Sequence, residues 1–172
     1  MKLLRNKLFW VALICAAPIL LGTAAYLFGW SPGGASNYGE LLDPRPVSGF
    51  ERLRGKWVLV SFDAAACDAY CEKKLYFMRQ VRRAQGKDMD RVERLWVLTD
   101  AAKPRPELLV AIEGTRIEKR DDLAGAFSGN AVDSIYLVDP FGNLMLRFPR
   151  DPDPSKMIKD LQRLLKYSPR PR

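Results

Sequence analysis

The sequence predicts an α/β domain with a partly parallel sheet, preceded by a single membrane-spanning helix. Two observations lead to this prediction. Residues 8–30 form one apolar run without a charged side chain, and the remaining chain alternates short β-rich runs with segments of helical periodicity. Such alternation implies crossover connections, which place strands parallel to one another. The composition, 48% hydrophobic and 28% charged over 172 residues, fits one globular domain with a small additional segment.

The apolar run at residues 8–30 is long enough to cross a bilayer. As a helix it extends about 35 Å, compared with a hydrocarbon core of about 30 Å. Trp10 lies near one end of the run, and Tyr26 and Trp30 lie near the other, where interfacial aromatic residues belong. A cleaved signal peptide is the alternative, but its apolar region is only about 7–15 residues long. We therefore expect an uncleaved transmembrane anchor.

The charges around this run predict its orientation. Lys2, Arg5 and Lys7 precede it, whereas the first charge after it is Glu40. The positive-inside rule therefore places residues 1–7 in the cytoplasm and the rest of the chain outside. In a bacterial-type inner membrane this predicts a single-pass protein with a periplasmic C-terminal domain.

The composition excludes several classes of function. The chain contains no histidine, which excludes histidine metal sites, Ser-His triads and histidine proton shuttles. Three of the eight net positive charges lie within residues 1–7, and the remaining basic side chains are scattered among acidic ones. Without a basic stripe interleaved with aromatic residues, we expect no nucleic-acid binding. Three cysteines are too few for a disulfide scaffold, and Cys15 is expected to be an inert apolar filler of the anchor.

The chain after the anchor begins with residues 31–49, a predicted linker and extended lead-in that starts with SPGGASN. The domain is predicted at residues 50–167, and a disordered basic tail at residues 168–172. Its first elements are a buried strand at 56–62 and a helix from Ala69 to Gln85, which Gly86 ends.

The second half of the domain contains three further strands and two further helices. Their expected positions, in chain order, are a strand at 94–99, a helix at 106–114, strands at 134–139 and 144–148, and a helix at 153–167. The turn PFGN joins the last two strands as a hairpin, and Ser155 is a candidate cap of the last helix. The order β-α-β-α-β-β-α is that of a thioredoxin-like fold, with a central mixed sheet flanked by helices.

Cys67 and Cys71 lie four positions apart, where the first strand turns into the first helix. The partial positive charge of a helix N-terminus favours thiolate over thiol. One helical turn places both sulfur atoms on the same face, where they are able to form a disulfide after modest adjustment or to hold one soft metal ion. The alternative is a pair of buried structural cysteines.

The charges around the two cysteines are mixed. Lys73 and Lys74 are expected to stabilise thiolates, whereas Asp63, Asp68 and Glu72 are expected to oppose them. Asp63 follows the first strand and is a candidate proton relay to a thiol, although a solvated carboxylate at a strand end is the simpler interpretation.

From about Phe50 to Leu165 the chain resembles the Sco/SenC family, which consists of membrane-anchored thioredoxin-fold proteins that help to build the copper centre of cytochrome c oxidase. GKWVLVSF, followed by the two cysteines, is similar to the strand and cysteine turn of the family. LWVLTDAAKPRPELL resembles the second strand, with Asp100 matching an aspartate of the family, and SIYLVDPFGNLMLRF matches the later hairpin. From its own position, Asp100 is interpreted as a turn residue.

The chain also departs from the family pattern. The family usually has Cys-Pro-x-x-Cys-Pro, where this chain has Asp68 and Glu72 in place of both prolines. The family's copper-binding histidine falls within residues 129–134, GNAVDS, where this chain has none. Asp133 is a hard ligand and a poor substitute for Cu(I). The resemblance therefore implies a divergent member that lacks the histidine ligand.

Three functions remain open. In a thiol–disulfide oxidoreductase, Cys67 is the attacking thiolate and Cys71 the resolving thiol. In a Cu(I) carrier, both thiolates hold the metal while a partner donates further ligands; Met78, at helical spacing, is interpreted as a core residue. In a non-catalytic assembly factor, the cysteines form only a cross-link. The resemblance implies the copper subunit of cytochrome c oxidase or a copper chaperone as partner, and the anchor implies the lipid bilayer.

Overall fold

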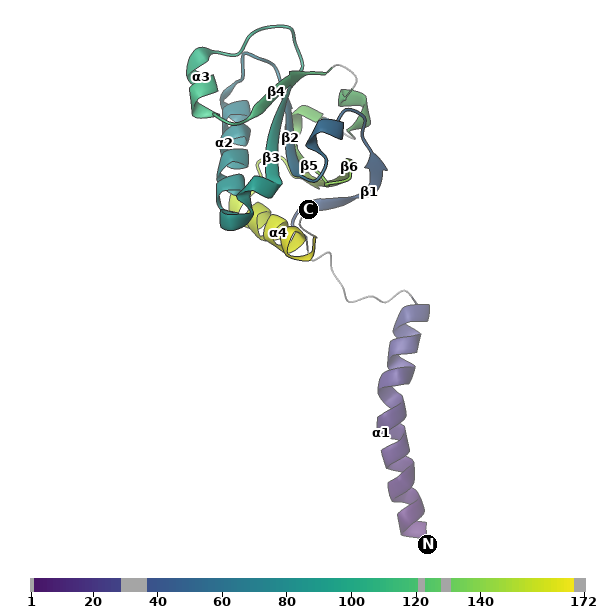
Figure 1. Ribbon diagram of the computed structural model, residues 1–172. Helices are drawn as coiled ribbons and strands as arrows, with labels where there is room; N and C mark the ends of the chain where they lie inside the picture. The colour runs from purple at the N-terminus through teal and green to yellow at the C-terminus, as the bar shows by residue number, and fades with distance from the viewer. Residues whose placement is uncertain (1, 29–36, 121–122, 128–130, 169–172) are drawn as a thin grey trace. The chain divides into compact units, whose positions relative to one another are not determined.

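The computed structural model describes residues 2–28, 37–120, 123–127 and 131–168 (Figure 1). The chain forms two compact units, residues 1–36 and 37–172. Several expectations fall outside the described residues: Trp30 at the end of the anchor, most of the linker start SPGGASN, and the tail from residue 169 onward.

The described part of the first unit consists almost entirely of one long helix, α1 (Lys2–Leu27). Its segment Phe9–Leu27 has a mean hydropathy of 1.9 and is long and apolar enough to cross a membrane. The helix begins before the expected anchor and includes the basic residues at its N-terminus. Pro18 lies inside it, and the Thr23 hydroxyl donates a hydrogen bond of 2.7 Å to the Ile19 carbonyl, as occurs in membrane helices.

The second unit is built on a six-stranded mixed sheet with the order β1-β6-β5-β2-β3-β4. The strands are β1 (Glu40–Pro46), β2 (Trp57–Asp63), β3 (Val92–Leu98), β4 (Arg116–Lys119), β5 (Ile135–Val138) and β6 (Asn143–Phe148). β2, β3 and β4 are parallel, whereas β5, β6 and β1 add antiparallel pairings. The predicted fold class, a mixed sheet flanked by helices behind one apolar helix, is confirmed.

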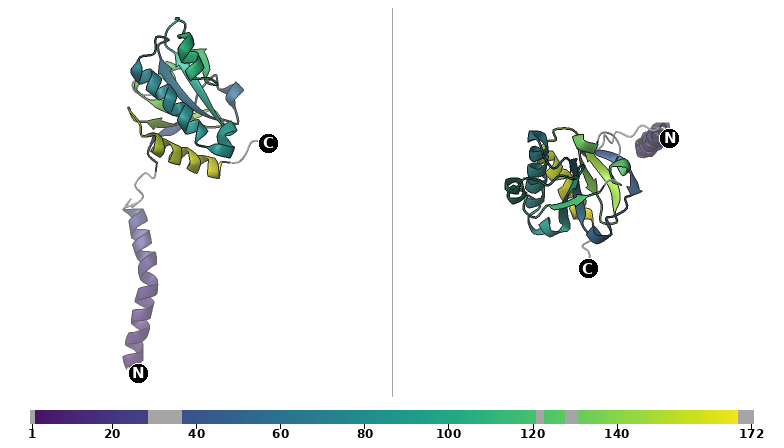
Figure 2. Two further views of the ribbon diagram at one scale, coloured as in Figure 1. Left: turned by 90° about the vertical axis from the view of Figure 1, so that its left-hand side faces the viewer. Right: turned by 90° about the horizontal axis from the view of Figure 1, so that it is seen from above.

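The helices α2 (Ala69–Arg83), α3 (Pro106–Ala111) and α4 (Pro154–Tyr167) cover one face of the sheet (Figure 2). The other face is covered by shorter pieces, including the single-turn helices η1 (Glu51–Leu53) and η3 (Ala124–Ala126). Two further short helices, η2 (Gly86–Arg91) and η4 (Ala131–Asp133), precede β3 and β5. β2 is buried at every position because it lies between two strands and beneath both layers.

Two edge strands, β1 and β4, were not predicted. β1, with the sequence ELLDPRP, lies within the expected linker and lead-in and is mostly exposed. It is fastened to β6 by its ladder and by Arg147, which donates two hydrogen bonds to Glu40 at 2.6 and 3.0 Å. Edge strands have solvent on one side and do not need an apolar run, so their sequences carry a weak signal.

The start of the second unit is bound to its last helix. The buried Asp160 carboxylate of α4 accepts hydrogen bonds from the backbone N–H groups of Tyr38, at 3.1 Å, and Gly39, at 2.8 Å. A side chain at position 39 would come within 3.0 Å of the Phe148 ring, so glycine permits this close approach.

The cap of α4 differs from the prediction. The Asp153 carboxylate accepts a hydrogen bond of 2.8 Å from the Ser155 backbone N–H, so Asp153 is the cap and Ser155 lies within the first turn. The pattern Asp-Pro before a helix explains the difference, because proline is favoured at the first helical position and Pro154 occupies it.

These positions make a matched pair of variants. We expect Asp153→Ala to lower the free energy of unfolding by about 1 kcal/mol, because an N–H of the first turn loses its acceptor. Ser155→Ala should change it by less than about 0.5 kcal/mol. Urea denaturation of both variants measures the difference, and equal effects would contradict the assignment of the cap.

Candidate functional site

The two cysteines lie at the carboxyl end of the parallel strands, where α/β proteins place their ligand sites. Cys67 lies in the turn between β2 and α2, and Cys71 lies in the first turn of α2. The Thr99 N–H, just after β3, donates to the Asp63 carbonyl at 3.1 Å. Asp100 accepts a hydrogen bond of 3.0 Å from the Ala65 N–H, so this carboxylate fastens the cysteine turn, in keeping with its interpretation as a turn residue.

Cys67 and Cys71 are joined by a disulfide, with their Cα atoms 5.2 Å apart. Cys67 is 4% exposed and Cys71 is 1% exposed, so both are more buried than a surface turn would suggest. They nevertheless line a cavity of about 210 Å³, together with Asp63, Ala64, Ala66, Asp68 and Val132. The two cysteines are therefore buried in the core on one side and line a small cavity on the other.

Cys67 has an unusual backbone conformation, with a φ of +43°. Side-chain-bearing residues adopt this left-handed region only when their surroundings hold them there. Here Arg105 donates a hydrogen bond of 3.1 Å to the Cys67 carbonyl and forms an ion pair with Glu72. The Asp68 side chain accepts a bond of 2.9 Å from the Cys71 N–H and caps α2.

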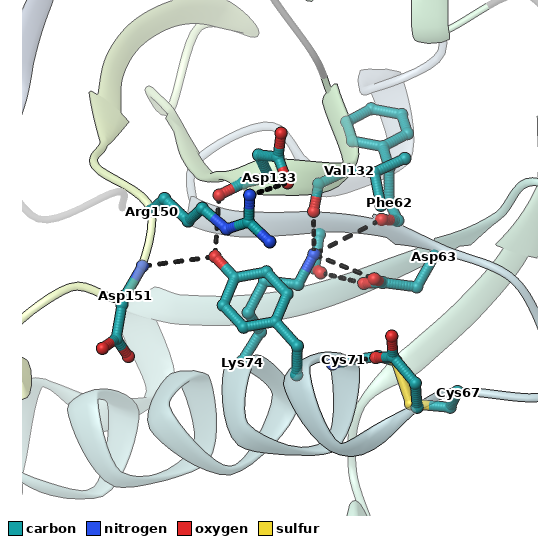
Figure 3. Close-up of polar contacts among 12 residues, drawn as sticks. Phe62, Asp63, Cys67, Cys71, Lys74, Val132, Asp133, Arg150 and Asp151 are labelled. Atoms are coloured by element: carbon teal, nitrogen blue, oxygen red, sulfur yellow. Dashed lines mark hydrogen bonds and ion pairs between the residues drawn. A yellow bond between two sulfur atoms is a disulfide. The ribbon is translucent and has the colours of Figure 1, made fainter.

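A buried ion pair lies beside the disulfide (Figure 3). The side chains of Lys74 and Asp63 are 1% and 5% exposed, and Lys74 Nζ lies 2.9 Å from Asp63 Oδ1. The same ammonium group donates to the Val132 carbonyl and lies 3.5 Å from the Phe62 carbonyl. Ser61 Oγ donates to the other Asp63 oxygen at 2.6 Å, so both charged groups are satisfied.

Burial is the main influence on Asp63. Loss of hydration raises the pKa of this carboxyl above its ordinary value of 3.8, while the Lys74 ammonium and the Ser61 hydroxyl partly offset that effect. Asp63 is thus a buried carboxylate with two partners, and the simpler interpretation of a solvated group at the strand end is wrong.

The η4 turn forms the wall of the site opposite α2. The Tyr70 hydroxyl donates to the Asp133 carbonyl at 2.8 Å, and the Asp133 carboxylate lies 3.6 Å from the Arg150 guanidinium (Figure 3). Asp133, considered as a substitute metal ligand, is thus paired with a cation. Met78 lies fully buried in the core, as predicted. In the described ranges, no group of three or more Cys, Asp or Glu side chains has a metal-binding arrangement.

The importance of Lys74 was only partly visible in the sequence. We expected Lys73 and Lys74 to act alike, but Lys73 pairs with Asp151 at the surface. Lys74 instead shares the buried face of α2 with Cys71, Leu75 and Met78. A lysine at helical spacing within an apolar stripe was the available signal, because such a charge requires a buried partner.

The raised pKa of Asp63 predicts a pH effect on stability. The folded protein keeps the Asp63 proton up to a higher pH than the unfolded chain does, so the resulting stabilisation is fully present below pH 3.8 and is lost as the pH rises through the folded-state pKa. The Asp63→Asn variant lacks this titrating group. We therefore expect the unfolding free energy of the parent minus that of the variant to decrease as the pH rises above 3.8, and then to become constant. Urea denaturation across this range measures it, and a difference that increases with pH would contradict the prediction.

Comparisons with solved structures agree with the fold of the second unit. ScoI of Bradyrhizobium japonicum with copper bound has 21% sequence identity and a TM-score of 0.52, covering 73% of this chain and 98% of that one. Yeast Sco1 with copper bound has 15% identity and a TM-score of 0.55, covering 77% and 91%. The thioredoxin domain of a thiol-disulfide oxidoreductase from Bacteroides vulgatus has 20% identity and a TM-score of 0.50, covering 78% and 99%. At these identities the likeness shows a shared fold. It therefore confirms the resemblance to Sco/SenC proteins as far as the fold is concerned.

No curated protein sequence matches the chain. Residues 57–168 match a family described as "Transmembrane-like, thioredoxin-like, C-terminal domain", and this match covers well over half of the chain. It begins at the first residue of β2 and ends one residue after α4, so it contains both cysteines and the Lys74–Asp63 pair. The chain therefore belongs to the family of transmembrane-like, thioredoxin-like C-terminal domains.

Proposed function

We propose that this protein is a membrane-anchored thiol–disulfide exchange protein in which Cys67 and Cys71 alternate between a disulfide and two thiols. The observation that carries the proposal is the disulfide itself, which lies at the N-terminus of α2 and borders on a cavity at the carboxyl end of the parallel strands. A disulfide that served only as a cross-link would not need this position, where a helix terminus stabilises a thiolate.

The exchange needs only the two sulfur atoms and a client dithiol. A client thiolate attacks Sγ of Cys67, the less buried of the two; the disulfide breaks, and its electron pair leaves on Sγ of Cys71. The second client thiol gives its proton to the Cys71 thiolate and attacks the client sulfur of the mixed disulfide; the bond to Cys67 breaks, and Cys67 leaves as a thiolate that takes up the proton lost by the first client thiol. The client is oxidised by two electrons and the protein is reduced by two; the reverse sequence reduces a client disulfide.

The proposed client is a cysteine-containing protein of the copper centre of cytochrome c oxidase, or a copper chaperone that serves it. Support comes from the fold shared with the copper-bound Sco structures and from the sequence resemblance to the Sco/SenC family. Cu(I), as cargo held by Cys67 and Cys71, is the alternative, since Cu(I) accepts two thiolate ligands. We further propose that α1 anchors the protein in a bacterial-type inner membrane with residues 37–172 in the periplasm.

A redox titration tests the exchange activity. In a Cys15→Ser background, we expect Cys67 and Cys71 to change together from disulfide to dithiol as the glutathione potential is lowered, with a gain of two alkylated thiols by mass spectrometry. Cys71→Ser is the control, because it leaves one thiol and no internal disulfide. Alkylation that does not respond to the glutathione potential would show that the cysteines are structural.

A second experiment measures copper binding and tests the alternative, a Cu(I) carrier. Anaerobic titration of the reduced protein with Cu(I) against a competing chelator, with Cys67→Ser for comparison, reports on the alternative. We expect weak Cu(I) binding that needs both cysteines and no stable Cu(II) complex, because Cu(II) prefers nitrogen and oxygen donors in a tetragonal site. A strong, stable thiolate-to-Cu(II) absorption band without a reversible two-electron step would favour the copper carrier.

The orientation is tested by protease protection. Protease added to intact bacterial spheroplasts should digest residues 37–172, since basic residues precede the apolar segment of α1. Detergent-permeabilised spheroplasts serve as the control for protease access. Full protection in the intact spheroplasts would refute the proposed topology.

A further inference from the structure

Lys74 follows Cys71 by about one helical turn on the buried face of α2. It is directed at the end of β2 and at η4, where it contacts Asp63 and the Val132 carbonyl (Figure 3). Asp63 and Val132 both line the cavity that contains the two sulfur atoms. The ion pair and the disulfide therefore occupy one connected site.

Stability alone is a poor reason for this arrangement. A buried ion pair loses nearly as much hydration energy as it gains by attraction, and apolar residues of similar size usually serve as well. Buried charges beside a reactive group are instead a common means of changing its chemistry.

The charge balance of the site changes with its redox state. With the disulfide closed, Lys74 and Asp63 form a neutral pair. When an attacking thiolate opens the disulfide, the leaving Cys71 sulfur becomes an anion in a place that is 1% exposed. The site then holds two anions, the Cys71 thiolate and the Asp63 carboxylate, for one buried cation. Lys74 favours that state by attraction, and Asp63 opposes it by repulsion.

We propose that Lys74 and Asp63 are positioning residues that set the reduction potential of the Cys67–Cys71 disulfide in opposite directions, Lys74 raising it and Asp63 lowering it. This inference rests on the proposed exchange function. The overall reaction balances: two glutathione thiols lose two electrons and two protons and form glutathione disulfide, the site gains both electrons and one proton and keeps one thiolate, and the second proton goes to the solvent. Neither positioning residue is consumed.

The experiment compares variants of the full chain in detergent micelles, in the Cys15→Ser background, by glutathione titration at neutral pH. We expect Lys74→Met to lower the equilibrium constant for reduction at least tenfold, which corresponds to about 30 mV for a two-electron couple. Asp63→Asn should raise the constant, by threefold or more. The double variant, which has no charge at either position, should lie between the two single variants.

Lys73→Met is the matched control. It removes the same charge one residue earlier in α2, but the Lys73 ammonium is exposed and pairs with Asp151. Solvent screens such a charge, so the constant should stay within about twofold of the parent. Lys74→Arg keeps the positive charge and should restore most of the loss seen with methionine.

Opposite shifts distinguish this role from a structural one. If the ion pair only supports the fold, both single variants lower the unfolding free energy and neither moves the constant, or both move it in the same direction; either result overturns the inference. If Lys74→Met does not fold, Asp63→Asn decides alone, and an unchanged or lowered constant overturns it. A parent disulfide that ignores glutathione would instead refute the proposed function, and this inference with it.

Discussion

The site depends on one ammonium group with three acceptors. Lys74 Nζ is bonded to the Asp63 carboxylate and the Val132 carbonyl and lies near the Phe62 carbonyl, so it joins the end of β2, the helix α2 and the turn η4. Removing one partner of such a buried pair leaves an uncompensated charge, which costs about 3–5 kcal/mol. Val132 is also one of the residues that line the cavity beside the disulfide, so this ammonium group binds part of the cavity wall.

The sequence predicts the central strands well because burial imposes a pattern on them. β2 is covered on both faces and flanked by two strands, so every residue in Trp57–Asp63 is buried and all but Ser61 and Asp63 are apolar. The helix α2 was predicted from its apolar spacing, and the structure has Cys67 in the turn before this helix and Cys71 in its first turn, as expected. β1 and β4 have one free edge, which relaxes the demand for apolar residues. For that reason both were missed.

The electrostatics of the site were less predictable, because they depend on contacts between distant positions. Lys74 finds its acceptors at Asp63, 11 positions earlier, and at Val132, 58 positions later. Local sequence shows only that a lysine interrupts an apolar stripe, and it does not identify the carboxylate that compensates the charge. Similarly, Glu72 was expected to oppose a thiolate, yet it is paired with Arg105, 33 positions away.

The attachment of Tyr38 and Gly39 to Asp160 has a mechanical consequence. When a chain enters a domain through an edge strand, tension on that chain can break the hydrogen bonds of the strand one after another. Here the two N–H groups that precede β1 are held by a carboxylate of α4, and α4 packs against α2. Tension on the chain before residue 38 is therefore borne by the packed helical layer before it reaches the β1–β6 ladder. The leading end of the domain is thus attached to a core helix as well as to the edge of the sheet.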